Sequence, residues 1–393
     1  MIPVENKLRV AVVGVGNMGH LHVRDVHNLP NTELAAVCDI NRERADAEAA
    51  QYGVKAYYDY RDLLARADFD GLLVATPHFD HTPISIAALQ QGIHVLVEKP
   101  IAAHAKDARR MIDAYEAARA TYPGLVFAAM FMQRTYGYYL AIKDLIDAGE
   151  LGRLVRTTWI ITDWFRTQIY YDSSDWRATW AGEGGGVLLN QCPHNLDLYQ
   201  WLVGMPARVT GFAHIGKYHN IEVEDEVTAY FEHENGMVGH FVTTTAESPG
   251  TNRLEIVGDM GKLVLEDQRL TFYRNRRPML RFIEEATGGF DKVEHWVCQV
   301  PFTHHGQPGH RLIIENFANA VLHGERLIAP ASEGIHSISL GNAIMLSSLL
   351  KRTVEMPLDE DLYETTLMGL IKNSRYRKVA RPAGVVDMSK SFG

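Results

Sequence analysis

The hexapeptide GVGNMG, which contains Gly14, Gly16 and Gly19, constrains the fold of this chain more than any other feature. It follows the apolar run LRVAVV and opens a helix-like segment. In that context the first glycine permits a tight turn, the second admits a pyrophosphate to the backbone, and the third allows close helix–strand packing. Free N–H groups at the start of such a helix face the anion. The motif predicts a dinucleotide-binding turn bordered by Asn17 and Met18.

Short apolar runs alternate with longer helical segments around this motif. The short runs indicate buried strands because they are brief and rich in β-branched residues. They are LRVAVV, ELAAVC, GLLVAT, HVLVE and LVFAAM. The segments expected to be helical are residues 18–28, 41–51, 82–91 and 105–121. This alternation predicts a parallel sheet covered on both faces, and hence an α/β protein whose residues 1–127 form a Rossmann domain.

The pattern changes after about residue 130. Helical segments at residues 138–148 and 191–203 precede a series of alternating runs divided by Gly, Asn and Asp. These runs, ARVTGFAHI, EVTAYFEH, GMVGHFVTTT, NRLEIVGD and GKLVLED, predict a mostly antiparallel sheet. Two further helices are expected near residues 310–323 and 332–350. We expect residues 128–393 to form an α+β domain for substrate binding and oligomerisation, with residues 375–393 as an arm or a loose tail.

Charge and composition narrow the choice of partners. The formal charge of −9 offers no attraction for nucleic acid or for an anionic membrane surface. Two basic runs, RNRR and RYRK, are expected to be solvated loop and tail charge. No secretory signal and no long apolar span is recognisable, and the three cysteines form no C-x-x-C pair, so we expect a cytoplasmic protein. In THHGQPGH no carboxylate or cysteine stands at ligand spacing, and we expect no metal.

Asp39 ends the second expected strand, where a carboxylate binds the adenosine ribose and repels a 2′-phosphate. NAD is therefore favoured over NADP, although Arg42 and Arg44 follow closely and can accommodate a phosphate. After the next strand, VATPHFDH places polar residues at the edge where open α/β sheets bind ligands. Asp80 or Thr82 is a candidate helix cap there. We expect cofactor contacts from Thr76, Pro77, His81, Glu98 and, after the last Rossmann strand, Gln133, with Met132 and Arg134 beside it.

The tripeptide EKP brings Lys99 out of the sheet at the same edge. Burial beside an oxidised nicotinamide would lower the pKa of the ammonium, so that it can pass protons near neutral pH. An exposed lysine that packs only its stem is the alternative reading.

A third motif, GGGVLLNQCPHNLDL, carries Asn190, His194 and Asp197. A helix that begins near Asn190 would place Asn190 and His194 on one face, with Pro193 in the first turn. The glycines would let the preceding loop pass close to a cofactor or sugar. An imidazole at a helix N-terminus is biased toward its neutral form, which suits a base. Asp197 either orients the His194 ring or pairs elsewhere within the fold.

The segment DWFRTQIYYDSSDWRATW interleaves aromatic rings with arginines. Such a composition suits a carbohydrate pocket, and equally an aromatic packing loop. The candidate substrate-binding residues, besides Asn190, are Trp164, Arg166, Tyr170, Trp176 and Arg177.

GVGNMG, Asp39, TPHFDH, HVLVEKP and the triple-glycine motif occur in this order, and together they resemble the glucose-fructose oxidoreductase and inositol dehydrogenase family, Gfo/Idh/MocA. The likeness extends from about residue 8 to residue 358. The resemblance implies a Rossmann domain joined to a domain with a large open antiparallel sheet that mediates homodimers or homotetramers. It also implies Lys99 and His194 as the catalytic pair. Many members carry aspartate where this chain has Asn190, which cannot take a proton.

The resemblance thus implies an NAD-dependent dehydrogenase that acts on a ring carbinol of a sugar, glycoside or cyclitol. Asn190 and the aromatic loop favour a sugar or glycoside over free inositol. Two alternatives remain at this point: an NAD-dependent glycosidase with no net redox change, and a dinucleotide-sensing regulatory protein.

Overall fold

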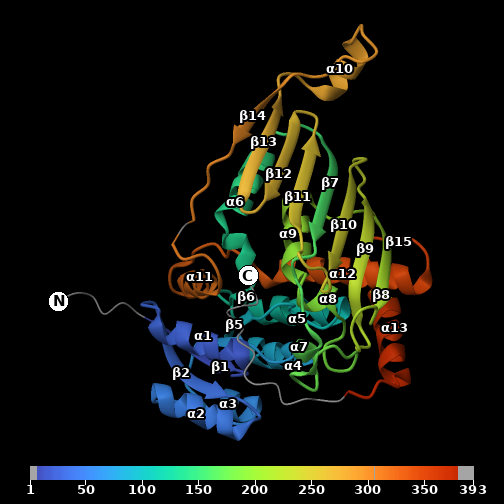
Figure 1. Cartoon of the computed structure of the whole chain (residues 1–393). Coiled ribbons are helices and arrows are strands. Elements are labelled where there is room, and N and C mark those ends of the chain that lie inside the picture. The colour runs from blue at the N-terminus through green and yellow to red at the C-terminus, as the bar shows by residue number, and fades with distance from the viewer. Residues whose placement is uncertain (1–6, 305, 379–393) are drawn as a thin grey trace, which may run out of the picture.

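The computed structural model describes residues 7–304 and 306–378. It contains a six-stranded parallel sheet, at the bottom of Figure 1, and a nine-stranded sheet above it, with helices between the two. The predicted fold class is confirmed.

The six-stranded sheet has the order β3-β2-β1-β4-β5-β6, and all its strands are parallel. Its strands are β1 (Leu8–Val13), β2 (Thr32–Cys38), β3 (Lys55–Tyr57), β4 (Gly71–Val74), β5 (His94–Val97) and β6 (Phe127–Ala129). The crossing helices are α1 (Asn17–Asn28), α2 (Arg42–Tyr52), α3 (Tyr60–Arg66), α4 (His78–Leu89) and α5 (Ala105–Arg119). Local signals set their ends: the Asn41 side chain caps α2, and Gly53 ends it with a φ of 69°.

The second sheet has the order β14-β13-β12-β11-β7-β10-β9-β8-β15. Its strands are β7 (Leu154–Ile161), β8 (Arg208–Ile215), β9 (Glu224–Glu232), β10 (Val238–Thr244), β11 (Asn252–Gly258), β12 (Gly261–Glu266), β13 (Arg269–Asn275), β14 (His295–Gln299) and β15 (Val354–Glu355). Neighbours are antiparallel except β7 and β10, which pair in parallel. Buried and more exposed residues alternate along β9 and β10, so one face of the sheet packs and the other is open.

The remaining helices lie mostly on the packed face or at the junction of the two sheets (Figure 1). They are η1 (Met132–Thr135), α6 (Gly137–Asp147), α7 (Gln168–Asp172), α8 (Val187–Asn190), α9 (Pro193–Val203), α10 (Met279–Glu285), α11 (His310–His323), η2 (Ala331–Glu333), α12 (Gly334–Leu350) and α13 (Glu360–Asn373). Helix α12 contacts α5 and α9 as well as β8, so it joins the two halves.

The first domain is not built from the N-terminal third alone. Helix α11 packs against α1 and β1, and its Ile313 and Phe317 share a core with Leu8 and Val10. Strand β6 also continues two residues beyond the expected boundary at residue 127. A helix from late in the chain therefore completes the nucleotide-binding half.

Several local expectations were wrong. Helix α4 begins at His78 with Pro77 as its cap, so neither Asp80 nor Thr82 caps it. The expected single helix near residue 190 is two helices, α8 and α9, with Gln191 and Cys192 between them. The sequence analysis also missed strand β13, the edge strand β14 and helix α13, whose short or weakly periodic sequences give little signal.

Among the described residues, no helix combines the length and apolar character needed to cross a membrane. The first residues of the predicted tail are described. Ser374 and Tyr376 bond to Glu222 and Asn220, which precede β9, and Lys378 bonds to Arg177 in the loop with the candidate substrate residues. Residues 379–393 fall outside the described residues.

Candidate functional site

The glycine turn between β1 and α1 has the form that a dinucleotide needs. Gly14 has a φ of 84°, and a Cβ on it would lie 2.6 Å from the carbonyl oxygen of Ala75. A Cβ on Gly19 would lie 1.8 Å from the carbonyl oxygen of Gly14. At Gly16 the nearest atom to such a Cβ is Nη1 of Arg44, at 3.9 Å. Two glycines are thus required by packing, and the third leaves the backbone open to a pyrophosphate.

Asp39 lies at the end of β2 beside this turn. Its Oδ2 accepts a hydrogen bond from the amide of Val15 at 2.9 Å, and its Oδ1 accepts one from the amide of Asn41 at 2.8 Å. These bonds hold the carboxylate where a ribose hydroxyl would bind it. The next residue, Ile40, is 92% exposed, although it is a large apolar side chain. The sequence analysis did not select Ile40.

At the end of β4 the expected cofactor residues His81 and Thr76 differ in their contacts with the protein. His81 is buried, with Nδ1 2.9 Å from the carbonyl oxygen of Pro100 and Nε2 2.8 Å from that of Thr76. Burial lowers its pKa. His81 therefore links the turns after β4 and β5. The hydroxyl of Thr76 is buried and has no hydrogen-bond partner among the described residues.

Lys99 follows β5 and reaches the second domain. Its Nζ donates a hydrogen bond of 2.9 Å to the backbone carbonyl of Asn190, the last residue of α8. Burial is the main cause that lowers its pKa, and the Glu98 carboxylate opposes that effect. The carboxylate of Glu98 accepts from the amide of Lys99 at 2.9 Å and contacts His22 at 2.6 Å. Glu98 thus holds the backbone of Lys99 in place through this hydrogen bond.

His194 lies in the first turn of α9, directly after Pro193. The break between α8 and α9 means that Asn190 and His194 do not share one helix face, contrary to the expectation. The His194 ring is 2% exposed, and neither of its nitrogens has a hydrogen-bond partner among the described residues. Burial, followed by the charge of Lys99, lowers its pKa well below the usual range. His194 is therefore a neutral imidazole with both nitrogens available.

Asp197 pairs within the fold and does not orient the His194 ring. Its carboxylate accepts two hydrogen bonds from Arg134, 2.7 Å from Nε and 2.6 Å from Nη2. Arg134 also pairs with Glu333 at 2.5 Å and is fully buried. The guanidinium of Arg134 is held between α9 and η2, and its position beside the nicotinamide stays a prediction. The neighbouring Gln133 is buried, and its Oε1 has no partner in the described part of the chain.

The aromatic loop brings its candidate residues together around Tyr170. The Tyr170 hydroxyl accepts from Nη1 of Arg177 at 2.7 Å and donates to Oδ1 of Asn190 at 3.3 Å. The guanidinium of Arg177 lies 4.4 Å from the centre of the Tyr170 ring and 4.7 Å from that of Trp176. Arg166 lies over both Tyr170 and Trp164. Asn190 therefore connects this loop to Lys99, because its side chain bonds to Tyr170 and its backbone carbonyl bonds to the lysine ammonium.

Two buried glutamates that sequence analysis missed shape this region. Glu183 accepts a hydrogen bond from the side chain of Asn190, and burial raises its pKa. Glu224 accepts from the amides of Gly186 and Leu188 at 2.9 and 3.0 Å. A Cβ on Gly186 would lie 2.0 Å from the Glu224 carbonyl oxygen. At this position the glycine serves packing against β9, and not the approach of a ligand as expected.

The basic run RYRK does not end in solvated charge. The ammonium of Lys378 is partly buried and donates to the carbonyl oxygen of Arg177. Burial lowers its pKa, an effect that Glu183 opposes. No sequence signal pointed to this contact, because it joins residues 201 positions apart.

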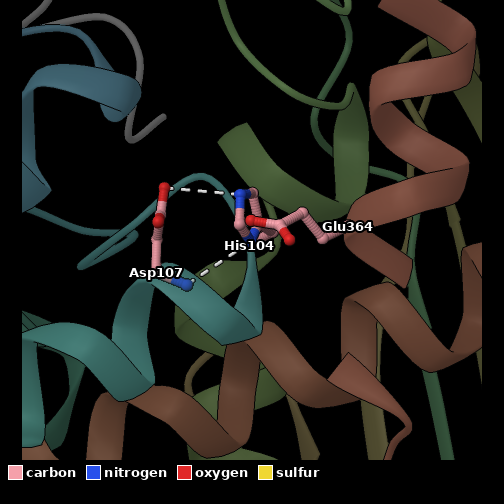
Figure 2. Close-up of side chains that lie close together, drawn as sticks. All are labelled: His104, Asp107 and Glu364. Carbon is pink, nitrogen blue, oxygen red and sulfur yellow. Dashed lines mark hydrogen bonds and ion pairs between the residues drawn. The ribbon is translucent and has the colours of Figure 1, made fainter. Parts of the chain in front are cut away.

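His104, Asp107 and Glu364 form a cluster whose ligand-type atoms lie within 4.8 Å of one another (Figure 2). Cations of the protein already neutralise both carboxylates. Lys106 contacts Glu364 at 2.6 Å, and Arg110 contacts Asp107 at 2.5 Å and Glu364 at 3.1 Å. The cluster therefore ties α5 to α13 as an ion-pair network, and its chemistry does not call for a metal.

The fold and this site define a class: a two-domain oxidoreductase with a Rossmann nucleotide-binding half. The model of the Gfo/Idh/MocA oxidoreductase family, with its NAD-binding Rossmann fold, matches residues 8–123, and the Gfo/Idh/MocA C-terminal domain matches residues 139–264. The chain belongs to this family. The predictions of an NAD-dependent dehydrogenase and of NAD as its cofactor are confirmed.

The sequence identity to individual relatives is low. The chain is 26% identical over 276 residues to scyllo-inositol 2-dehydrogenase (NAD(+)) of Bacillus subtilis, a match that covers 67% of this chain and 75% of that protein. It is 25% identical to levoglucosan dehydrogenase of Pseudarthrobacter phenanthrenivorans over 89% of this chain and 98% of that protein. The crystal structure of the WlbA dehydrogenase from Bordetella pertussis with NADH and UDP-GlcNAcA has a TM-score of 0.76 and 27% identity, and covers 90% of this chain and all of that one.

Proposed function

We propose that this protein is a dehydrogenase for a secondary ring hydroxyl of a sugar, glycoside or cyclitol, with Lys99 and His194 handling the hydroxyl proton. One observation carries the proposal. The lysine of the first domain reaches the backbone of α8, while its charge acts on the buried, unpartnered imidazole at the start of α9. Two proton-handling groups from different domains thus serve one place beside the nucleotide-binding edge.

The two side chains suit different halves of the proton step. His194 is neutral at pH 7 because burial and the Lys99 charge both lower its pKa, so a ring nitrogen can accept the hydroxyl proton. The ammonium of Lys99 has three donors and uses one on Asn190, so two remain to stabilise the developing alkoxide. Bound NAD supplies the hydride acceptor. The alternative within this mechanism exchanges the two roles, with Lys99 as the base and His194 as the hydrogen-bond donor.

The substrate class rests on the loop around Tyr170 and on the relatives. An aromatic surface of Tyr170 and Trp176 with the arginine Arg177 between them suits the C–H face and hydroxyls of a sugar. Dehydrogenases of inositol and of levoglucosan are among the similar proteins. Because Asn190 is an amide already bonded to Glu183, it can orient a hydroxyl but cannot carry its proton. The glycosidase and regulatory alternatives are not favoured, since both of these relatives are dehydrogenases.

The test is a panel of cyclitols, sugars and glycosides with NAD or NADP, read as absorbance of NADH at 340 nm. With the best substrate, Lys99→Ala and His194→Ala should each lower kcat by about 10³-fold, while NAD affinity changes less than threefold. His323→Ala removes an exposed imidazole at the end of α11 and should leave turnover unchanged. Near-normal kcat in the His194 variant would contradict the mechanism. Silence of the whole panel despite tight NAD binding would contradict the substrate class.

We also propose that copies of the chain meet through the open face of the nine-stranded sheet, as a homodimer or homotetramer. Phe212 is 60% and Ile215 42% exposed on β8, near one end of that sheet. Exposed apolar groups on a sheet face are typical of subunit contacts. A mass of 44.1 kDa in light scattering, that of one chain, would contradict this assembly. A cytoplasmic location stays a prediction.

A further inference from the structure

A buried histidine lies beneath the candidate catalytic lysine. His22, in α1, is 0% exposed, and its Nε2 lies 2.6 Å from Oε1 of Glu98. The other oxygen of Glu98 accepts the backbone N–H of Lys99 at 2.9 Å. The imidazole thus contacts the lysine turn through a single carboxylate. The sequence analysis did not select His22, because it lies on a helix among apolar residues with no motif of its own.

The charges along this connection depend on one another. Burial acts to raise the pKa of Glu98, but the hydrogen bond and charge of His22, together with the charges of His310 and Lys99, outweigh it and hold the pKa well below the usual range. A buried carboxylate without such a partner would take up a proton. The Glu98 charge is also the largest opponent of the burial that lowers the pKa of Lys99. Loss of the His22 imidazole should therefore lower the pKa of Lys99.

We propose that His22 is a positioning residue: it orients the Glu98 carboxylate and, through it, the turn and the charge state of Lys99. This proposal deepens the proposed function. Its turnover test depends on the proposed dehydrogenase activity, whereas its NMR test does not. It assigns α1 a second role besides the glycine turn at its start. His22 is fully buried and contacts the Lys99 turn through Glu98, so its effect on Lys99 is indirect.

Other ionisable groups surround the connection. From α11, the His310 ring centre lies 5.4 Å from that of His22, and burial lowers the pKa of His310 to about 4, so it is neutral at pH 7. Asp25, in α1, acts on His310 in the opposite direction. On the other side of Glu98, its charge acts on His81 and His194. Lys99 is the group whose titration reports the effect most directly.

The test uses three substitutions at His22. His22→Phe keeps a ring but removes the donor, His22→Asn is too short to reach Glu98, and His22→Gln retains a donor at similar reach. The pKa of Lys99 is measured by NMR on ¹³C-methylated lysines, with Lys99→Arg to assign its signal. We expect that pKa to fall by about one unit or more in the Phe and Asn variants and to recover in the Gln variant.

The matched control is His104→Asn. His104 is also a buried imidazole of the first domain, within 3.3 Å of the Asp107 carboxylate, and asparagine preserves its capping of α5 (Figure 2). It should leave the pKa of Lys99 unchanged. In turnover, the alkaline limb of kcat/KM should move to lower pH in the Phe and Asn variants only, with KM for NAD within twofold.

An unchanged pKa of Lys99 in the Asn or Phe variant would overturn the proposal. An equal shift in the His104 control would also overturn it, because the effect would then be a general consequence of lost packing. Absence of NADH formation by the parent enzyme contradicts the proposed function instead, and the NMR measurement still decides the role of His22.

Discussion

Replacing Asp197 by asparagine tests what the carboxylate three residues after His194 does. In the structure both its oxygens accept hydrogen bonds from Arg134, and both side chains are 1% exposed. Removing one charge of a buried pair costs about 3–5 kcal/mol of folding free energy. Arg134 keeps Glu333 as a second partner, so we expect the lower end, about 3 kcal/mol. Turnover should change less than fivefold, since no bond joins Asp197 to the imidazole.

The assays are denaturant unfolding and kcat with the best substrate of the panel. Glu333→Gln is the control, because its side chain is 39% exposed and its pair with Arg134 should contribute less than about 1 kcal/mol. The opposite pattern would refute the reasoning. If Asp197 oriented the His194 ring, stability would change little and kcat would fall by about 10⁴-fold, as when a serine-protease triad loses its carboxylate.

Two further outcomes are expected. Burial raises the pKa of Glu224 from 4.5 to about 7, so the folded state holds a proton that the unfolded chain releases. The protein should therefore lose about 3 kcal/mol of stability as pH rises from 4.5 to 7. In thermal unfolding, Glu224→Gln should remove this pH dependence, whereas Glu226→Gln on the same strand should keep it. Asp39→Ser should weaken NAD binding about tenfold and admit NADP, because the cation of Arg44 remains beside the glycine turn; fluorescence titration showing unchanged NAD affinity would contradict the role of Asp39.

Sequence patterns were most informative where chemistry and local geometry coincide. The φ of 84° at Gly14 and the approach of Gly19 to the carbonyl oxygen of Gly14 both depend on residues within the turn, so the glycine spacing predicts its shape. The contact of Gly14 with Ala75 is an additional, tertiary one. Lys99 at the end of a buried strand is likewise predictable, because parallel strands in one sheet present their carboxyl ends at one edge. The α/β architecture was predictable as well, because the spacing of apolar residues along the chain distinguishes strands from helices.

Local patterns were misleading where a distant residue decides the geometry. The segment from Asn190 to Asp197 looked like one helix with a functional face, but its Asp197 turns to Arg134, 63 residues away. The triple glycine suggested room for a ligand, whereas Gly186 is required by the backbone of Glu224. Spacing along a helix cannot reveal which of several possible partners a carboxylate meets.

The sequence by itself determined the nucleotide turn, the edge of the sheet where Lys99 emerges, and the order of the two domains, since each depends on residues close together in the chain. Only the tertiary structure decided that His22 contacts Glu98, that Arg134 pairs with Asp197, and that Lys378 bonds to Arg177 in the aromatic loop. Burial costs a charge several kcal/mol unless it finds a partner, and the available partners become known only when distant segments are packed together.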